Sequence, residues 1–478
     1  MTVGHTGDPV PGANKANSVN KANTVNAPNA VNSTETANIQ DSTNVTDTAR
    51  TDDSRALQAQ RRRILVSGAI GTTIEYFDFL LYGLIAPVVF ETLFFPRANA
   101  LVGTIAVLGT FAFGYVARPL GGVIFGHFGD RVGRKPVMFV TLVLMGGCTT
   151  LIGLLPTYAA IGVAAPILLA ILRFAQGIAL GGETVGAVVM AAEGAPQGKR
   201  GGYAGFVQIG AALGSVFAAL AAGMVAGMPA SQGLSWGWRI PFLASAVLVL
   251  IGVYVRARID ESAVFRAATK RAPRRVPIAA ALRKEPRACI TVFLSTIAET
   301  SMLQMFTVYI LVYGRQALGI DTAVMLQGVL IGNIVGCFAN PMFGRLSDFV
   351  GRKVMLASSL IIGIFYVAFA FFPLLRTHND ALVVLAIAIP PALIQTLLFS
   401  TEGSFYAELF SDASRRFSGL GLSRQLGGVI GGFFPLIAAW LLAVSGSIWS
   451  VIGYYVAVSV ISLGAVLSAR ETSRDTLA

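Results

Sequence analysis

The sequence predicts an all-α membrane protein with twelve transmembrane helices in two parallel six-helix repeats, on three observations. The chain of 478 residues is 54% hydrophobic and only 13% charged, whereas soluble domains carry about a quarter charged residues, and its mean hydropathy is +0.68. Twelve apolar runs are each long enough to cross a hydrocarbon core of ~30 Å as a helix. Two sequence patterns recur at nearly one offset, which indicates a duplication.

The N-terminal segment 1–60 differs in composition from everything that follows. It is rich in Asn, Thr, Ala and Ser and contains almost no large apolar side chains. Such a segment cannot bury enough apolar surface to offset the entropy of ordering it. It also lacks the basic start and apolar run of a cleavable signal peptide. We therefore predict that residues 1–60 form a disordered cytoplasmic tail.

The apolar runs divide into two groups of six. We place them at 64–91, 100–126, 136–156, 161–192, 201–228, 238–256, 288–313, 323–343, 354–375, 381–408, 417–444 and 448–469. They are uninterrupted, which favours helices over the alternating strands of a membrane β-barrel. The only long internal loop, the cytoplasmic linker 257–287, separates an N-terminal half (61–256) from a C-terminal half (288–469), and a short cytoplasmic tail (470–478) follows.

The positive charges indicate the orientation in the membrane. The net charge is +12, but the outer loops of this arrangement hold only Arg97, Arg315 and Arg376. By the positive-inside rule both termini lie in the cytoplasm, and we expect a multi-pass protein of the cytoplasmic (inner) membrane. Topology and attraction to anionic lipid then explain the charge, so we expect the lipid bilayer as a partner and no nucleic acid.

The cysteines and histidines argue against a metalloenzyme. Cys148, Cys289 and Cys337 stand singly in apolar runs, and the three histidines are far apart in sequence. Neither a disulfide framework nor a metal site has the spacing it needs. A nucleophile with its base and a Walker-type phosphate loop are also missing. We therefore expect no enzyme, no metal and no cofactor.

The recurring patterns show how the halves are related. GHFGDRVGRKPVM at 126–138 recurs as GRLSDFVGRKVML at 344–356, an offset of 218, and Gln208 to Gly214 recurs at 425–431, an offset of 217. Because each half has an even number of spans, both halves insert with the same orientation. The duplication thus predicts parallel repeats with a central cavity between them.

The two copies of G-x-x-x-D-x-x-G-R-K join spans two to three and eight to nine. Their glycines permit tight turns, their aspartates can cap a helix or pair with a cation, and their Arg-Lys pairs anchor at head groups. These loop motifs comprise Gly126, Asp130, Arg131, Gly133, Arg134 and Lys135, then Gly344, Asp348, Gly351, Arg352 and Lys353. We add Glu408 and Arg424, near the inner ends of spans ten and eleven, which suit either a gate-closing or a static salt bridge.

These loop motifs, with LRFAQG at 172–177, resemble signatures of the major facilitator superfamily over residues 64–469. Within it the chain resembles the metabolite:proton symporters, which include shikimate, α-ketoglutarate, citrate and proline/betaine carriers. The resemblance lies in EYFDFLLY (75–82), RPLGG (118–122), QGIALGGE (176–183), WGWRIPF (236–242) and AELF (407–410). It implies the major facilitator fold and secondary active transport of a small-molecule substrate.

Independently of that resemblance, charged residues occur in the middle of two spans. Each costs about 2.5–3.5 kcal/mol in hydrocarbon, so such side chains usually face a cavity and one another. One helical stripe carries Glu75, Asp78 and Tyr82, and a second carries Arg173, Gln176 and Glu183. Our hypothesis is that Asp78, with Glu75 as the alternative, binds a coupling proton and pairs with Arg173. The alternative is a permanent ion pair between spans one and four.

Further polar residues in the spans are candidates for substrate binding. Arg118 and Arg239 suit an anion, although each can also snorkel or cap a helix end. The others suit a hydrogen-bonding cavity or contacts between helices. The full set is Tyr76, Tyr82, Arg118, Gln176, Glu183, Gln208, Arg239, Glu299, Gln304, Tyr309 and Gln395.

We therefore predict a monomeric proton-coupled symporter for a small organic acid of the shikimate or dicarboxylate kind, with the proton as coupling ion. The alternatives are a symporter for a zwitterion such as proline or betaine and, below it, a drug/proton antiporter. Only about eight residues follow Arg470, whereas the osmosensory members of the family carry a long coiled-coil tail. The residues 205–210 offer no proline-containing antiporter signature.

Overall fold

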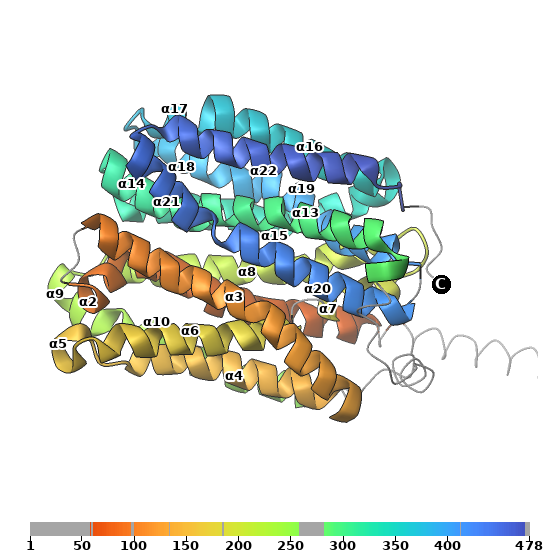
Figure 1. Cartoon of the computed structure of the whole chain (residues 1–478), viewed down its shortest axis with the longest axis horizontal. Helices are drawn as coiled ribbons and strands as arrows, with labels where there is room; N and C mark the ends of the chain where they lie inside the picture. The colour runs from red at the N-terminus through yellow and green to blue at the C-terminus, as the bar shows by residue number, and fades with distance from the viewer. Residues whose placement is uncertain are drawn as a thin grey trace, which may run out of the picture. The chain divides into compact units, whose positions relative to one another are not determined.

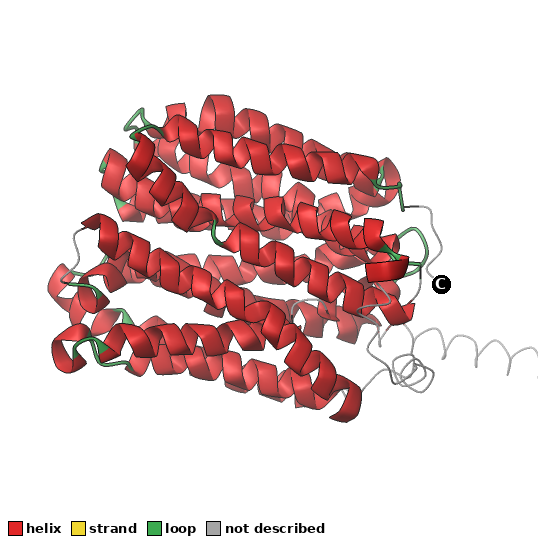
Figure 2. Cartoon of the chain, in the orientation of Figure 1, coloured by secondary structure: helices red, strands yellow, loops and turns green. Residues whose placement is uncertain are grey.

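The computed structural model describes residues 58, 61–96, 100–132, 134–183, 186–257, 282–411 and 413–473. The predicted tail 1–60, apart from residue 58, and most of the predicted linker 257–287 lie outside these residues. All regular elements of the described part are helical (Figure 2).

Twelve helices are long and apolar enough to cross a membrane, which confirms the predicted fold class. They are Arg61–Phe94, Leu101–Phe125, Pro136–Leu154, Ala164–Gly182, Arg200–Ala226, Ala230–Val255, Pro286–Leu318, Thr322–Val350, Arg352–Leu375, Asp380–Leu409, Gly419–Ser445 and Ile448–Ser468. Most ends lie within a few residues of the predicted ones. The predicted fourth span, 161–192, corresponds to two described helices, Ala164–Glu183 and Gly186–Glu193, and residues 184 and 185 between them lie outside the described residues.

The N-terminal half begins with a helix over 61–85 that continues through the π-helical turn η1 (Ala86–Phe90) into α2 (Glu91–Phe94). The following elements are α3 (Ala100–Val132), α4 (Arg134–Leu154), α5 (Tyr158–Ile161), α6 (Ala164–Glu183), α7 (Gly186–Glu193), α8 (Arg200–Ala226), α9 (Ala230–Gln232), η2 (Gly233–Gly237) and α10 (Arg239–Ala257).

The C-terminal half repeats this plan. Its first span consists of α13 (Pro286–Gln304), η3 (Met305–Tyr309) and α14 (Ile310–Leu318). The next elements are α15 (Thr322–Val350), α16 (Arg352–Tyr366), η4 (Val367–Phe371), α17 (Phe372–Leu375), α18 (Asp380–Ile389), η5 (Pro390–Ile394), α19 (Gln395–Leu409), α20 (Ala413–Gly432), α21 (Phe434–Ser445) and α22 (Ile448–Ser468). The π-helical turn η3 holds nearly the same place in the second repeat as η1 in the first, so the first spans of both halves widen at equivalent places.

Helices α8 and α15 lie side by side between the remaining helices of the two halves (Figure 1). Their close approach explains one glycine of the loop motif. A Cβ on Gly344 would collide with the backbone carbonyl oxygen of Gly201 on α8. Small residues let two helix backbones come this near. Gly344 is therefore a packing residue between the halves.

Candidate functional site

Asp78 lies at the middle of the first span and is completely buried. The Ser245 hydroxyl, from α10, donates a hydrogen bond to Asp78 Oδ1 at 2.5 Å. Helix α4 passes alongside: a Cβ on Gly146 would lie 3.4 Å from Asp78 Oδ2. Glu75, one turn earlier on the same helix, is also buried. Both predicted proton-binding carboxylates thus lie inside the bundle and not toward lipid.

Arg173 on α6 is buried at 1% exposure. Its Nη1 donates to Gln176 Oε1 at 2.6 Å, and Gln176 Nε2 donates to Thr149 Oγ1 at 2.8 Å. The guanidinium carbon lies 4.0 Å from the ring centre of Tyr82, whose hydroxyl shares a hydrogen bond with that of Thr110 at 2.6 Å. Arg173 Nε and Nη2 have no hydrogen-bond partner. The hydrogen bond of Arg173 goes to Gln176, and its pairing with Asp78 stays a prediction.

A second arginine approaches the same group of rings. The Arg118 guanidinium carbon, from α3, lies 4.0 Å from the ring centre of Tyr115 and 4.5 Å from that of Phe79. The Arg173 carbon lies 5.4 Å from the same Phe79 ring. Arg118 Nε is buried and has no hydrogen-bond partner. Among the described residues neither guanidinium forms an ion pair. Each is therefore a cation that lies against aromatic faces and keeps N–H donors free for another partner.

The C-terminal half contains a cluster of three charged side chains. Arg424 Nη2, from α20, donates to Glu299 Oε1 of α13 at 3.0 Å and to Glu402 Oε1 of α19 at 2.9 Å. The side chains of Glu402 and Glu299 are 0% and 5% exposed and that of Arg424 is 11% exposed. These charges therefore lie in a region nearly without solvent.

Sequence reasoning missed Glu402, although the repeat contains a signal for it. Glu183 is one of the candidates from the fourth span of the first repeat. Glu402 occupies nearly the equivalent position in the second repeat. The pairing of Arg424 was also not foreseen, since it was grouped with Glu408 as a gating residue. Glu402 and Glu408, both on α19, point about 120° apart around the helix. Arg424 contacts only the deeper of the two.

Two predicted glutamines link the halves, and two predicted residues have unsatisfied polar atoms. Gln304 Nε2 donates to the Tyr115 hydroxyl at 2.5 Å, and Gln208 Nε2 donates to the Phe399 carbonyl oxygen at 3.2 Å. The Tyr309 hydroxyl and Gln395 Nε2 are buried without a hydrogen-bond partner. Such atoms are available to a bound polar solute.

The remaining predicted residues lie in different surroundings. Arg239 Nη1 donates to the carbonyl oxygens of Gly153 and Leu155 at 2.7 and 2.8 Å, so it caps the end of α4. Tyr76 on span one is within electrostatic reach of Glu299 and Arg424. The side chains of Glu183 and of the first loop motif (Gly126, Asp130, Arg131, Gly133, Arg134 and Lys135) lie outside the described residues.

The second loop motif fastens the two halves together. Asp348 accepts hydrogen bonds from the backbone nitrogens of Gly201 and Gly202, the first turn of α8, at 2.9 and 3.0 Å. It also accepts one from Arg352 Nη2 at 2.6 Å. A carboxylate at a helix N-terminus satisfies free N–H groups and complements the helix dipole. Asp348 therefore caps a helix of the opposite half.

Two ion pairs between the halves surround that cap. Arg200 Nη1 lies 3.5 Å from Glu408 Oε1, and Arg416 Nη1 lies 2.7 Å from Glu193 Oε1. The two arginines hold nearly equivalent places in the two repeats, and so do the two glutamates. Each half thus presents its arginine to the glutamate of the other. Glu408 also accepts from Arg352 Nε at 3.3 Å.

Glu471, beyond the last span, caps a helix at this same end. The backbone nitrogens of Arg352 and Lys353, at the start of α16, donate to its carboxylate at 2.8 and 3.0 Å. Partial burial raises the pKa of the Glu471 carboxyl, but hydrogen bonds from the backbone of Arg352, Ser473 and Lys353 outweigh it and hold that pKa below its usual value. Lys353 Nζ donates to the Ala469 carbonyl oxygen at 3.1 Å. The chain beyond the last span therefore binds to the loop motif.

The halves are also in contact at the opposite end. Arg315 Nη1, from α14, donates to the carbonyl oxygens of Pro87 and Val88 at 3.1 and 3.2 Å. Gln316 Nε2 donates to Thr104 Oγ1 at 2.6 Å. In this structure contacts between the halves therefore occur at both ends of the bundle.

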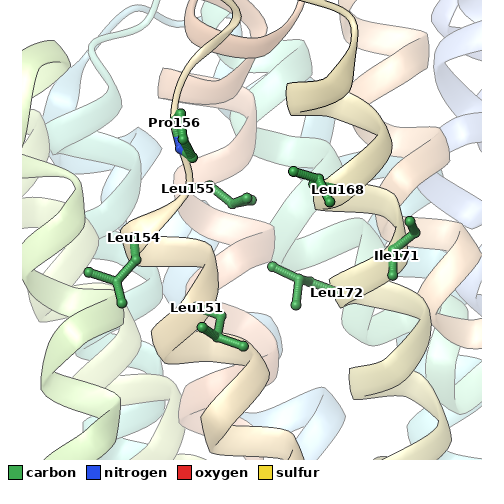
Figure 3. Close-up of a pocket in the computed structure, with 7 residues that line it drawn as sticks. All are labelled: Leu151, Leu154, Leu155, Pro156, Leu168, Ile171 and Leu172. Atoms are coloured by element: carbon green, nitrogen blue, oxygen red, sulfur yellow. The ribbon is translucent and has the colours of Figure 1, made fainter. Parts of the chain in front are cut away.

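An apolar pocket of about 250 Å³ lies between α4 and α6 (Figure 3). Its lining is Leu151, Leu154, Leu155, Pro156, Leu168, Ile171 and Leu172. Leu154 and Ile171 are more than half exposed, at 59% and 56%, as expected of a surface that faces lipid. The lining offers no side-chain hydrogen bond, so the pocket lacks the polar groups that fix a charged solute.

Comparison with known proteins identifies the family. Residues 68–432 match the family model described as Major Facilitator Superfamily. The chain is 38% identical to the inner membrane metabolite transport protein YhjE of Escherichia coli (87% of this chain, 96% of that protein). It is 36% identical to the shikimate transporter of the same organism (88% and 98%). A solved structure of the proton:xylose symporter XylE shares the fold, with a TM-score of 0.66 at 16% identity over 88% of this chain and 98% of that one. The chain is therefore a multi-pass membrane protein that belongs to the Major Facilitator Superfamily of secondary transporters.

Proposed function

We propose that this protein symports a small organic acid with a proton across the cytoplasmic membrane by alternating access. The observation that carries the proposal is the pair Arg118 and Arg173. Both guanidiniums contact the Phe79 ring, and both keep buried N–H groups without an acceptor. Two unpaired cations in a low-dielectric interior are costly unless an anion joins them. A carboxylate substrate supplies that anion and accepts from a planar guanidinium in two-pronged geometry.

A proton on Asp78 would balance part of the charge that moves with the substrate. The carboxyl group lies at mid-span and is buried, with the Ser245 hydroxyl on one oxygen. A protonated Asp78 is neutral, so the loaded carrier reorients with less buried charge. Inward movement of one proton supplies about 2.3 kcal/mol per 100 mV of membrane potential, besides the pH gradient.

Alternating access requires the contacts at the two ends to break in turn. We assign the loop-motif end, with Asp348 and the Arg200–Glu408 and Arg416–Glu193 pairs, to the cytoplasm. The Arg315 contacts then lie on the outer side, in line with the distribution of Lys and Arg in the loops. Opening toward the cytoplasm would break the first set and preserve the second.

Uptake of radiolabelled shikimate, α-ketoglutarate, citrate, benzoate and proline into cells that express the protein tests this function. Addition of an uncoupler should abolish accumulation of at least one of the four acids. Accumulation of proline alone would show that the substrate is a zwitterion, which is the second candidate, and not an organic acid. Accumulation that survives the uncoupler would remove the proton from the mechanism.

A further inference from the structure

One nitrogen of Arg424 holds two carboxylates. Glu299 Oε1 and Glu402 Oε1 both accept from Arg424 Nη2, at 3.0 and 2.9 Å. The second oxygen of each glutamate is also buried, and neither has a hydrogen-bond partner. Two carboxylates on a single nitrogen must lie close to each other, and such carboxylates cannot both ionise easily. The two unsatisfied oxygens are where a proton would be held.

A count of charges also indicates that the two glutamates share one proton. With both glutamates ionised, the three groups carry one net negative charge in a nearly solvent-free place. With one proton on the pair, the cluster is neutral. The groups packed around it do not supply a closer cation. Arg118 is within electrostatic reach of Glu299 but stacks on Tyr115.

The other titratable groups that approach the cluster in the described part of the chain are tyrosines. Tyr76 approaches from the first span and is itself within electrostatic reach of Glu75. Tyr406 approaches from α19, with its ring centre 5.9 Å from the Arg424 guanidinium carbon and its hydroxyl accepting from Ser295 Oγ at 2.9 Å. Neither tyrosine supplies a positive charge that would neutralise a second ionised glutamate.

We propose that Glu299 and Glu402 form a second proton-binding site in the C-terminal half, which shares one proton at rest, and that a second proton frees Arg424 to bind a carboxylate. In the resting cluster one ionised glutamate neutralises Arg424. When that glutamate takes up a proton, both glutamates are neutral. The Arg424 guanidinium then donates its hydrogen bonds to an external carboxylate in their place. The cluster stays neutral before and after, because one proton enters with each carboxylate charge. The Arg424 step rests on the proposed transport of an organic acid, whereas the shared proton does not.

Infrared spectroscopy of the purified protein tests the shared proton without any substrate. A protonated carboxylic acid gives a carbonyl stretch distinct from that of a carboxylate. At neutral pH we expect this band in the unmodified protein, and we expect either Glu402→Gln or Glu299→Gln to remove the intensity of one carboxylic acid from it, because the remaining glutamate pairs with Arg424 as an anion. Arg424→Gln should strengthen the band, since both acids then stay protonated. Asp380→Asn, an exposed position in the first turn of α18, is the matched control and should leave it unchanged. A band of undiminished intensity in both single variants would overturn the shared proton.

Binding of shikimate to the purified protein, measured with proton uptake in weakly buffered solution, tests the role of Arg424. Arg424→Gln should weaken binding about 10- to 100-fold, as expected for loss of a charge-assisted hydrogen bond. The double variant Glu299→Gln with Glu402→Gln should take up about one proton fewer per bound shikimate, because Arg424 is then free at every pH. Unchanged affinity in Arg424→Gln, or unchanged proton uptake in the double variant, would refute this step. If uptake by the unmodified protein is insensitive to uncoupler while the infrared result holds, the proposed function fails and the proton pair stands.

Discussion

Ser245 donates a hydrogen bond to Asp78 across 167 residues of sequence. The bond joins α10 to the first span at mid-depth, and the second carboxylate oxygen lies beside α4, 3.4 Å from where a Cβ on Gly146 would stand. Asp78 therefore contacts α10 directly and lies beside α4, so a substitution at this position tests a group enclosed by three helices.

Asp78→Asn should abolish uncoupler-sensitive accumulation of the substrate. The amide has the shape of a protonated carboxyl and can still accept from Ser245, so folding and exchange of substrate across the membrane should persist. Membrane vesicles with an imposed pH gradient measure accumulation, and preloaded vesicles measure exchange. Asp380→Asn serves as the control and should accumulate normally. Normal accumulation in Asp78→Asn would contradict the assignment.

Arg173→Gln should raise the KM for uptake about 10- to 100-fold, through loss of charge-assisted hydrogen bonds to the substrate. Arg173→Lys should recover little, because an ammonium cannot reproduce the planar stacking on Tyr82. Arg239→Gln is the comparison: it removes bonds that cap α4 and should lower stability by about 1.5–3 kcal/mol with little change in KM. Equal KM values for the two glutamine variants would show that Arg173 does not contact substrate.

Exchange of the charges in the Arg416–Glu193 pair should show whether it fastens the loop-motif end. Arg416→Glu alone places two acids together and should expose this end, whereas Arg416→Glu with Glu193→Arg should close it again. Labelling of a cysteine introduced near Gly201 by a membrane-impermeant thiol reagent in inverted vesicles reports the opening. Unchanged labelling in all variants would mean that the pair contributes nothing to closure.

Asp348→Asn should weaken the same end by a different route. The variant keeps an oxygen for the N-terminus of α8 but loses the charge that pairs with Arg352, at a cost of about 1–3 kcal/mol. Thermal unfolding of the purified protein measures the loss. A Tm equal to that of the unmodified protein would show that the cap is energetically neutral.

Stability should fall in acid partly because of Glu471. Its pKa is lower in the folded protein than in the unfolded chain, so its contribution is complete above the unfolded pKa and is lost as the pH falls through the folded pKa. Glu471→Gln should therefore show a flatter dependence of Tm on pH on the acidic side. Proteolysis of the chain end beyond α22 at acid pH gives a second measurement. An identical pH profile in the variant would contradict the cap.

The twelve-helix fold could be predicted because hydrophobic runs are local in sequence. The duplication likewise appears as repeated letters, and one of the repeated residues, Gly344, lies where α8 and α15 touch. The depth of Asp78 and Arg173 also follows from counting along a helix. The partners of these side chains cannot be found by such counting, because the rotation and tilt of each helix decide which of its faces contacts a neighbouring helix.

The C-terminal cluster shows the limit most clearly. Arg424, Glu299 and Glu402 come from three helices, and no spacing along the chain places them on one nitrogen. Glu471 is a similar case, since its nearest sequence context is a polar tail and its partners lie 118 and 119 residues away. Only comparison of the two halves, residue by residue, points to Glu402.

The matched π-helical turns η1 and η3 have a mechanical consequence. Each turn accommodates an extra residue between hydrogen bonds, and helices bend readily at such places. Because both lie beyond the buried carboxylates along their spans, the end segments α2 and α14 can bend as a matched pair while the charged residues keep their places.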